Sequence, residues 1–479
     1  MEALRLEQIA EWCGGALVRG EPRALALRVG TDSRAARVGD CFVALKGERH
    51  DAHEFLPEVA RAGAVAAIVQ RRVVAPSGKL AFIEVDDTLT ALQRLAGNYR
   101  DSLKLKVVGV TGSNGKTTTK DLCASVLAQK FSIAKTTGNF NNHIGLPLSL
   151  LGANAAHAIG VFELGMNHAG EIAALASLAK PDVAVVTNIG RAHIEFLGSR
   201  AAIAREKGAL VESLGKGGVA VLNADDEWSA GIARRCKGRV ITTGIRRAAD
   251  VRARAVEIGA SAKFTLCFRQ TREEARVKLP MLGRHQIYNA LQAAAVGRTC
   301  NMKIEDIVVG LEQLKAPEMR MQAEQIGNVR IFNDAYNANP DSVEAALAAF
   351  RHVRASGRKI IVLGDMMELG EHTQAAHGEV GRLLAEEGGV KVLVTVGAFA
   401  RVIGKTAIRS GLEDALVVAF DTAADAAKFL KMEARTGDCI LLKGSRRVGL
   451  EQIVQALREH ARQQGGAADS EAELASSHH

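Results

Sequence analysis

A chain of 479 residues is too long for one hydrophobic core, so we expect two to four domains. With 47% hydrophobic and 24% charged residues, its composition is that of a globular rather than a disordered protein. The net charge of +9 is spread without a basic block, and only 4% of residues are aromatic, which disfavours a nucleic-acid-binding surface.

The cysteines and the first residues bear on the compartment. The seven cysteines lie far apart, with no CxxC pair and no zinc-binding spacing, which predicts reduced thiols. The start, MEALRLEQIAEWCGG, lacks the basic and apolar regions of a signal peptide. No apolar run approaches the roughly 20 residues of a membrane span. We therefore expect a cytoplasmic monomer with no nucleic-acid partner and no membrane span.

Residues 1–103 predict a small α/β domain. Strands are expected at 40–45, 64–69 and 82–85, and helices at 55–62 and 88–99. Two polar loops, residues 31–34 and 46–53, are candidates for ligand contacts, although ordinary solvated turns would have the same composition.

Residues 107–120, VVGVTGSNGKTTTK, form the most informative stretch of the chain. The apolar run 105–110 predicts a buried strand, and after a Gly/Ser/Asn turn Lys116 and Thr117 open a segment with helical spacing. Free N–H groups at such a helix start suit a phosphate chain, with Lys116 reaching the terminal phosphates and the Thr117 hydroxyl on Mg²⁺. Because Val110 occupies the position six before the lysine, where a glycine is usual, the loop is a variant P-loop. We assign ATP binding to Gly112, Ser113, Asn114, Gly115, Lys116, Thr117 and Thr118.

The rest of residues 104–316 predicts a nucleotide domain built on a parallel sheet covered by helices. Glu163 ends the expected strand 159–164, where a carboxylate for Mg²⁺ would lie. His193 follows the expected strand 183–188 on the same sheet edge, as a metal ligand or as a hydrogen-bonded structural histidine. Further strands are expected at 218–223 and 240–243, a β-hairpin around Gly259 over 251–268, and a helix over 285–300.

Residues 317–463 alternate again and predict a doubly wound, Rossmann-like sheet, which binds ligands at the carboxyl ends of its strands. The expected strands are 329–332, 360–363, 392–396, 417–420 and 440–442, and the expected helices are 342–351, 374–386, 423–434 and 449–462. Residues 464–479 are polar and rich in small side chains, which predicts a disordered tail. The fold class is therefore α/β, with three domains.

The absence of an NKxD motif disfavours a GTPase, and no nucleic-acid signal accompanies the P-loop. A small-molecule kinase or an ATP-dependent ligase remains. Three α/β units with the ATP loop in the middle suit a reaction that joins ATP with two further substrates.

Three further blocks carry a resemblance: residues 138–148 (GNFNNHIGLPL), 333–340 (NDAYNANP) and 364–370 (GDMMELG). With the TGxNGKT form of the loop, the chain resembles the Mur ligase family over about residues 28–460. This family forms amide bonds with ATP in peptidoglycan precursor synthesis. The blocks are most similar to those of the member that adds D-alanyl-D-alanine, and the DNPR motif of the member that adds diaminopimelate or lysine is absent.

The resemblance implies a role for each matching residue. Lys116, Glu163, His193 and Lys207 would be catalytic, with two Mg²⁺ ions held by Thr117, Glu163, His193 and, if it carries a carbamate, Lys207. ATP would also contact Asn289, Arg320, Asp334, Tyr336 and Asn337, although Met319 precedes Arg320 where a glycine is common. The UDP-substrate would meet Ser33, Arg34, Lys46, Asn139, Asn141 and Asn142, and the dipeptide side would include His377, Lys443, Ser445 and Arg446.

The implied reaction joins UDP-N-acetylmuramoyl-tripeptide to D-alanyl-D-alanine through an acyl phosphate. The third residue of the tripeptide, diaminopimelate or lysine, stays open. A folylpolyglutamate or cyanophycin-like ligase of the same family is an alternative, as are a P-loop small-molecule kinase and, more distantly, an ATP-gated binding protein. A phosphate chain and a carboxylate repel each other, so Mg²⁺ and Lys116 would have to neutralise the charge that develops between them.

Overall fold

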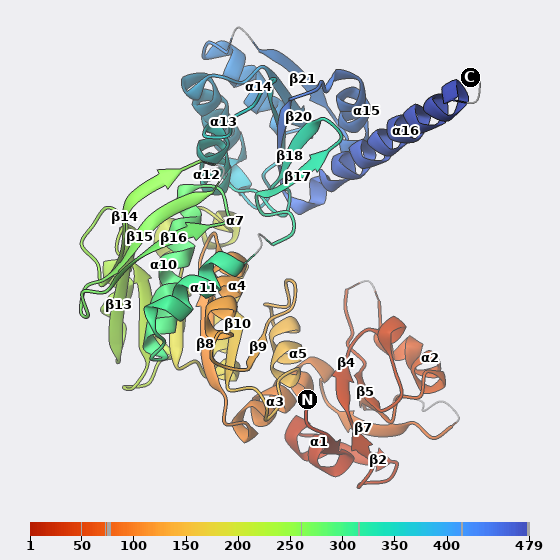
Figure 1. Ribbon diagram of the computed structural model, residues 1–479. Coiled ribbons are helices and arrows are strands. Elements are labelled where there is room, and N and C mark those ends of the chain that lie inside the picture. The colour runs from red at the N-terminus through yellow and green to blue at the C-terminus, as the bar shows by residue number, and fades with distance from the viewer. Residues whose placement is uncertain are drawn as a thin grey trace.

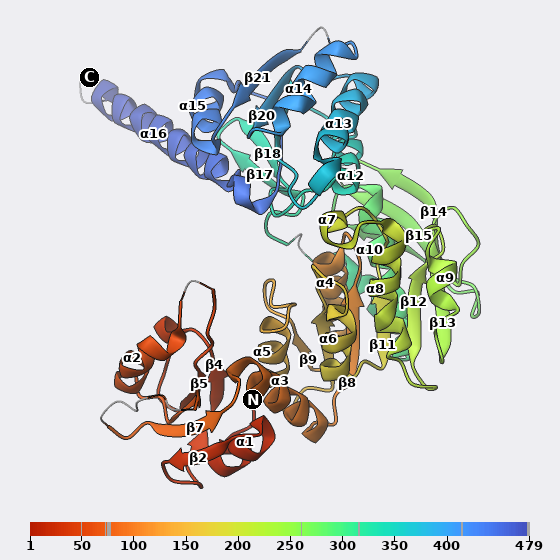
Figure 2. The ribbon, with the colours of Figure 1, turned by 180° about the vertical axis from the view of Figure 1, so that it is seen from behind.

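The computed structural model describes residues 1–476 except 49, 72, 74–77, 260, 315–316 and 413–414, with side chains described as far as residue 463. The chain is an α/β protein whose three main sheets lie in separate parts of the sequence. In Figures 1 and 2 the N-terminal part (red to orange) and the C-terminal part (turquoise to blue) both adjoin the middle part. None of the described helices is both long and apolar enough to cross a membrane.

The N-terminal part has a five-stranded sheet of order β2-β7-β6-β5-β4, parallel except for β2. Alternate side chains of its strands point to opposite faces. Cys41 and Ile68 therefore pack with α1 and α3, whereas Phe42 and Ala67 pack with α2. Its elements are β1 Leu4–Arg5, α1 Leu6–Cys13, β2 Ala16–Arg19, β3 Leu25–Ala26, β4 Arg28–Gly30, η1 Ser33–Ala35, β5 Asp40–Val43, η2 Ala52–Phe55, α2 Leu56–Arg61, β6 Ala66–Gln70, β7 Ala81–Val85 and α3 Thr88–Ser102.

The middle part has a nine-stranded sheet of order β16-β15-β14-β13-β12-β11-β8-β10-β9. Its strands are parallel from β9 to β14, and helices cover both faces of this region, as the sequence predicts. Its elements are β8 Lys106–Thr111, α4 Lys116–Leu127, β9 Ile133–Lys135, α5 Gly145–Leu151, β10 Ile159–Glu163, α6 Glu171–Ala179, β11 Val183–Val186, α7 Ile194–Leu197, α8 Arg200–Glu212, β12 Val219–Asn223, α9 Ser229–Ala233, β13 Arg239–Gly244, β14 Val251–Ile258, β15 Ala262–Phe268, β16 Glu274–Leu279, α10 Arg284–Thr299 and α11 Ile304–Gln313.

The C-terminal part has a six-stranded sheet of order β17-β18-β22-β19-β20-β21, parallel except for β17. Ile361 and Leu363 pack with α12, α13 and α14, whereas Ile360 and Val362 pack with α15 and α16, so the sheet is doubly wound. Its elements are β17 Gln322–Ile326, β18 Val329–Asn333, α12 Pro340–Arg351, β19 Lys359–Gly364, η3 Gly370–His372, α13 Thr373–Glu387, β20 Val392–Val396, α14 Ala400–Arg409, β21 Leu416–Phe420, α15 Ala423–Glu433, β22 Cys439–Lys443, η4 Arg446–Val448 and α16 Glu451–Ser476.

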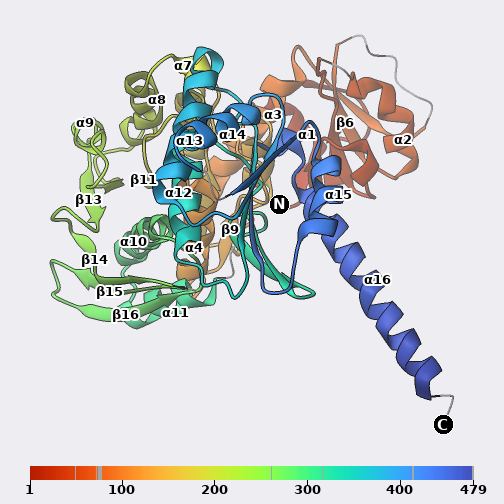
Figure 3. The same cartoon turned by 90° about the horizontal axis from the view of Figure 1, so that it is seen from above.

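The structure differs from the sequence prediction in several elements. The hairpin over 251–268 is present as β14 and β15, but it extends the main sheet and gains a third strand, β16. Strand β17 and helix α14 were not predicted. Where a disordered tail was predicted from residue 464, α16 continues to Ser476 and projects from the C-terminal part (Figures 1 and 3). Propagation from an already packed helix avoids the nucleation penalty, and Ala and Glu favour it.

Helix α3 joins the N-terminal and middle parts. It packs against α1 and also against α5 and α6. The buried Tyr99 hydroxyl donates to the Ala153 carbonyl at 2.7 Å and accepts from the Glu2 amide at 2.8 Å. The division near residue 103 therefore stays a prediction, and the proposed linker residues 315–316 lie outside the described residues.

Replacement of Tyr99 by phenylalanine should destabilise this junction. The Ala153 carbonyl is buried and would lose its donor, so the free energy of unfolding should fall by about 1–3 kcal/mol. Urea denaturation followed by circular dichroism measures the change. Ser177→Ala, which removes an exposed hydroxyl bonded within its own helix, is the control and should leave the transition in place. Equal transitions for Tyr99→Phe and the wild-type protein would contradict this role.

Candidate active site

The P-loop connects β8 to α4 at the carboxyl edge of the middle sheet. Gly112 has φ +146°, and a Cβ there would lie 1.8 Å from the Thr187 hydroxyl oxygen. Gly115 has φ +80°, and a Cβ there would lie 2.5 Å from Asn289 Oδ1. Both positions therefore require glycine, because a side chain would be strained and would also collide. Asn289 is thus placed directly behind the loop.

The loop leaves the start of α4 available to an anion. The first N–H groups of a helix have no partner within it, and the helix dipole makes this end positive. The Lys116 ammonium folds back on the loop and donates to the carbonyls of Gly112 at 2.9 Å and Ser113 at 3.3 Å. Burial lowers the pKa of Lys116. A phosphate chain would offer this amine the stronger, charged acceptor.

Glu163 ends β10, the parallel neighbour of β8, and is only 2% exposed. Its Oε2 accepts a hydrogen bond from the Thr117 hydroxyl, and its Oε1 accepts one from the Asn141 amide, both at 2.7 Å. Arg320 from the C-terminal part donates to the same Thr117 oxygen at 2.8 Å. The expected proximity of Glu163 to the helix that begins at Lys116 is therefore observed.

His193 and Lys207, the other two residues predicted to be catalytic, belong to the region of α7 and α8 in the middle part. His193 precedes α7 and lines the cavity beside the P-loop. Its Nδ1 lies 2.7 Å from Oε2 of Glu368, an ion-pair distance, although the angle is not that of a hydrogen bond. Lys207 on α8 is fully buried, and its Nζ has no hydrogen-bond partner among the described residues. Burial lowers the pKa of Lys207 well below its ordinary value, and nearby Lys116 lowers it further.

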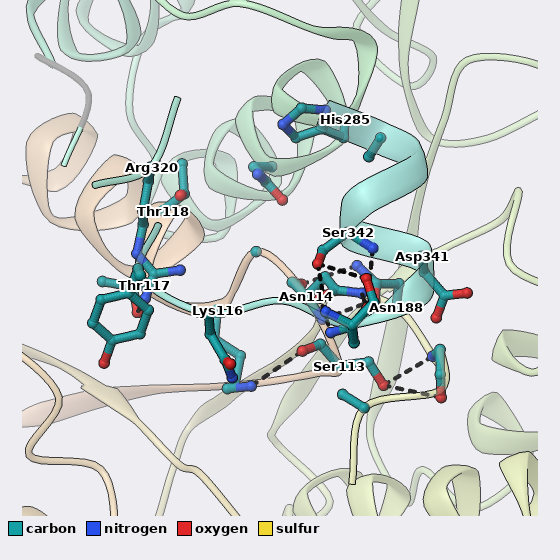
Figure 4. Close-up of a pocket in the computed structure, with 18 of the residues that line it drawn as sticks. Ser113, Asn114, Lys116, Thr117, Thr118, Asn188, His285, Arg320, Asp341 and Ser342 are labelled. Carbon is teal, nitrogen blue, oxygen red and sulfur yellow. Dashed lines mark hydrogen bonds between the residues drawn. The ribbon is translucent and has the colours of Figure 1, made fainter. Parts of the chain in front are cut away.

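A cavity of about 560 Å³ lies between the middle and C-terminal parts, and Figure 4 shows its walls. On one side Arg320 lies near Thr117 and stacks on the Tyr336 ring, with its guanidinium carbon 4.1 Å from the ring centroid. Asp334 pairs with the buried Lys443 at 2.8 Å. The structure thus brings together most of the predicted ATP-binding residues: Ser113, Asn114, Gly115, Lys116, Thr117, Thr118, Asn289, Arg320, Asp334, Tyr336 and Asn337.

Several contacts that were not predicted from the sequence join the two parts. The side-chain amides of Asn114 and Asn339 exchange hydrogen bonds of 2.8 and 3.3 Å. Arg191 pairs with Asp341 at 2.9 Å and Glu379 at 2.5 Å. Asn339 caps α12, with Pro340 in its first turn and a reciprocal bond to Ser342. The Asn-Pro-x-Ser pattern could have predicted this helix start, but not its partner across the interface.

A second cavity of about 1170 Å³ adjoins the first, and Thr117, Asn139, Arg320, Tyr336 and Asn337 line both. Ser445 and Arg446, predicted for the dipeptide side, also line the second cavity.

Two other residues predicted to contact substrates, Asn142 and His377, line neither cavity. Asn142 accepts from the amides of Ile144 and Gly145 at the start of α5. His377 is buried, with Nε2 accepting from the Met366 amide at 3.1 Å and Nδ1 2.7 Å from the Thr373 carbonyl. Both ring nitrogens of His377 are therefore occupied by the backbone.

Three residues predicted for the UDP-substrate, Ser33, Arg34 and Lys46, lie on the N-terminal part and line neither cavity. Arg34 pairs with Asp32 at 2.8 Å, and Lys46 lies 4.0 Å from Asp51. Their assignment stays a prediction.

Two regions of the chain match domains of a known protein family. Residues 110–297 match the Mur ligase middle domain, and residues 319–446 match the Mur ligase, glutamate ligase domain. The UDP-N-acetylmuramoyl-tripeptide--D-alanyl-D-alanine ligase of Bacillus subtilis is 38% identical, over 95% of this chain and 98% of that protein.

Two solved structures are similar over nearly their whole length. MurF from Acinetobacter baumannii has a TM-score of 0.87 at 34% identity, covering 96% of this chain and 99% of that chain. The MurF ligase from Thermotoga maritima in complex with ADP has a TM-score of 0.79 at 30% identity, covering 91% and 98%. The chain therefore belongs to the Mur ligase family.

Proposed function

We propose that the protein is an ATP-dependent ligase that joins the terminal carboxylate of UDP-N-acetylmuramoyl-tripeptide to the amine of D-alanyl-D-alanine, in peptidoglycan precursor synthesis. The observation that carries this proposal is the group formed by Lys116, Thr117 and Glu163 at the start of α4, which Arg320 and Tyr336 face from another part of the chain. The D-alanyl-D-alanine ligases among its relatives supply the choice of substrates. We also propose that the enzyme acts as a monomer.

The nucleotide would lie in the first cavity. The N–H groups at the start of α4 and the Lys116 amine would bind its terminal phosphates. Arg320 would add a second positive charge from the C-terminal part, and Asn289, Asp334, Tyr336 and Asn337 would border the rest of the molecule. These two cations, from different parts of the chain, would stabilise the negative charge that develops when a carboxylate attacks the γ-phosphorus.

The donor set fits magnesium. Mg²⁺ in nucleotide enzymes is held by one or two protein oxygens and by substrate phosphates rather than by a full protein cage. The Thr117 hydroxyl and the Glu163 carboxylate supply such oxygens 2.7 Å apart, and His193 lines the same cavity. Among the described residues no group of three His, Cys, Asp or Glu side chains could hold a metal without substrate. When bound, Mg²⁺ would neutralise phosphate charge and polarise the transferred phosphoryl group.

We further propose that Lys207 carries a carbamate and provides an oxygen ligand for a second ion. A buried amine with no hydrogen-bond partner among the described residues is unfavourable as an ammonium, and burial lowers the pKa of Lys207, which favours the neutral amine. A neutral amine can attack CO₂, forming an N–C bond and releasing a proton. The resulting carbamate would place a negative charge near the Lys116 ammonium.

Two steps would complete the reaction. The tripeptide carboxylate takes the γ-phosphoryl group, giving an acyl phosphate and ADP, and the dipeptide amine then attacks the acyl carbon and displaces phosphate. The second cavity adjoins the phosphate-binding one through Thr117 and Arg320, so both organic substrates could reach the reacting phosphate. Alignment of this kind can supply roughly 7–11 kcal/mol of a barrier.

We place the reaction in the cytoplasm. All seven cysteines are unpaired, and burial raises the pKa of the thiols of Cys13 and Cys267 to about 11. Unpaired thiols are normal in a reducing compartment.

Phosphate release tests the proposed function directly. The protein should release phosphate from ATP only when both the UDP-muramoyl-tripeptide and D-alanyl-D-alanine are present, with an amide product detected by mass spectrometry. Phosphate that appears with either substrate alone, without an amide product, would favour a kinase or another ATPase.

Lys116→Ala should abolish turnover, because the terminal phosphates lose their nearest cation. Calorimetric titration should still detect the UDP-substrate, which is expected to bind chiefly to the N-terminal part. Lys130→Ala removes another lysine of the middle part, one that lies outside both cavities, and should retain activity. Wild-type turnover by Lys116→Ala would refute the assignment of the loop.

Removal of dissolved CO₂ should lower activity if Lys207 is carbamylated. Bicarbonate should restore the activity of the wild-type protein but not of Lys207→Ala, because only the lysine provides an amine to modify. Carbon-13 NMR with labelled bicarbonate should show one carbamate signal that Lys207→Ala lacks. Full activity without CO₂ and no such signal would contradict the modification.

A further inference from the structure

Glu368 belongs to the 364–370 block (GDMMELG), which has so far received no role in the reaction. It lies between β19 and η3 in the C-terminal part, and its Oε2 is 2.7 Å from Nδ1 of His193 in the middle part. Glu368 lines the second cavity and His193 lines the first. The pair therefore lies where the two cavities and the two parts of the protein meet.

The backbone on both sides of this contact is strained. His193 has φ +63° and Glu368 has φ +62°, a region that residues other than glycine rarely adopt. Such conformations cost on the order of 1–3 kcal/mol each and persist where the surroundings enforce them, often at functional sites. The Glu195 amide donates to the Glu368 carbonyl at 3.4 Å, so the two strained segments also touch through their backbones.

The other three carboxylates that line the second cavity are either paired with a lysine or exposed to solvent. Asp121 pairs with Lys135 at 2.8 Å, and Glu195 and Glu318 are exposed. Glu368 is partly buried and faces the imidazole across the interface.

A carboxylate beside one nitrogen of an imidazole determines what the other nitrogen can do. The negative charge of Glu368 Oε2, 2.7 Å from Nδ1 of His193, favours the ring proton on Nδ1 electrostatically, although the angle is not that of a hydrogen bond, and leaves a lone pair on Nε2. Among the described residues none makes a hydrogen bond to Nε2 of His193. In metal-binding histidines this kind of partner fixes both the tautomer and the orientation of the ring.

We propose that Glu368 is a positioning residue that holds the His193 ring with Nε2 presented to the nucleotide cavity, and that this orientation exists only while the C-terminal part is docked on the middle part. The inference rests on the proposed function, in which His193 faces a divalent cation. It adds that the third part of the chain completes the cation site, although it supplies no ligand to it.

Glu368→Gln tests the proposal, since it keeps the size of the side chain and removes its charge. In the presence of ADP, Mn²⁺ should bind the variant about 10–100-fold more weakly than the wild-type protein, as followed by electron paramagnetic resonance. The kcat should fall by a similar factor, while the KM for D-alanyl-D-alanine stays unchanged. Glu371→Gln is the matched control, because Glu371 lies three residues away with its side chain 90% exposed, and it should behave as wild type.

A double variant separates positioning from direct binding. If Glu368 acts through His193, Glu368→Gln should weaken Mn²⁺ binding no further in a His193→Ala background. Glu368→Asp retains the charge on a shorter side chain, should recover part of the affinity, and replaces the glutamine variant if that fails to fold.

Three results would overturn the proposal: wild-type Mn²⁺ affinity in Glu368→Gln, additive losses in the double variant, or a rise in the dipeptide KM alone. Failure of the wild-type protein to make an amide would instead refute the proposed function. The Mn²⁺ titrations need no turnover, so they still decide the role of Glu368.

Discussion

The hydrogen bond from the Thr117 hydroxyl to Oε2 of Glu163 is the contact on which the site depends. It forms because β8 and β10 are adjacent parallel strands, with Glu163 opposite Val110, so that the end of one strand meets the helix that follows the other. A carboxylate that is 2% exposed requires donors, and Thr117 and Asn141 provide them. Arg320 then reaches the same hydroxyl from the C-terminal part. One buried charge thus organises three distant segments.

Two basic groups lie beside this bond in a way that suits a polyphosphate. Lys116 follows the loop next to Thr117, Arg320 donates to the Thr117 hydroxyl, and burial lowers the pKa of Lys116. A polyanion that binds here would be stabilised by groups already in place. The arrangement accordingly favours phosphate binding over any tight internal pairing of these side chains.

The interface between the middle and C-terminal parts includes both polar contacts and buried apolar side chains. The Asn114–Asn339 amide pair and the ion pairs of Arg191 with Asp341 and Glu379 hold it together. The contact of His193 with Glu368 lies on this interface, so the geometry of the catalytic cavity is linked to its docking.

Local patterns in the sequence determined much of this protein. Apolar runs predicted β8, β10, β11 and the parallel strands of the C-terminal part, because strands buried on both faces are almost continuously apolar. They did not reveal β17 (QAEQI) or β16 (EARVKL), antiparallel additions at sheet edges with mixed composition. The glycines, Lys116 and Thr117 of the P-loop were likewise legible, since phosphate binding at a helix start uses neighbouring residues.

Only the tertiary structure decided which distant side chains meet. The sequence marked Asn339 and Glu368 within distinctive blocks, but nothing local indicated that they face Asn114 and His193 across an interface. It also gave no sign that Lys207 has no hydrogen-bond partner among the described residues, because the burial of an amine depends on how α8 packs against the rest of the molecule. Residue types and spacings are properties of neighbouring positions in the chain, whereas these contacts arise from the packing of elements far apart in it.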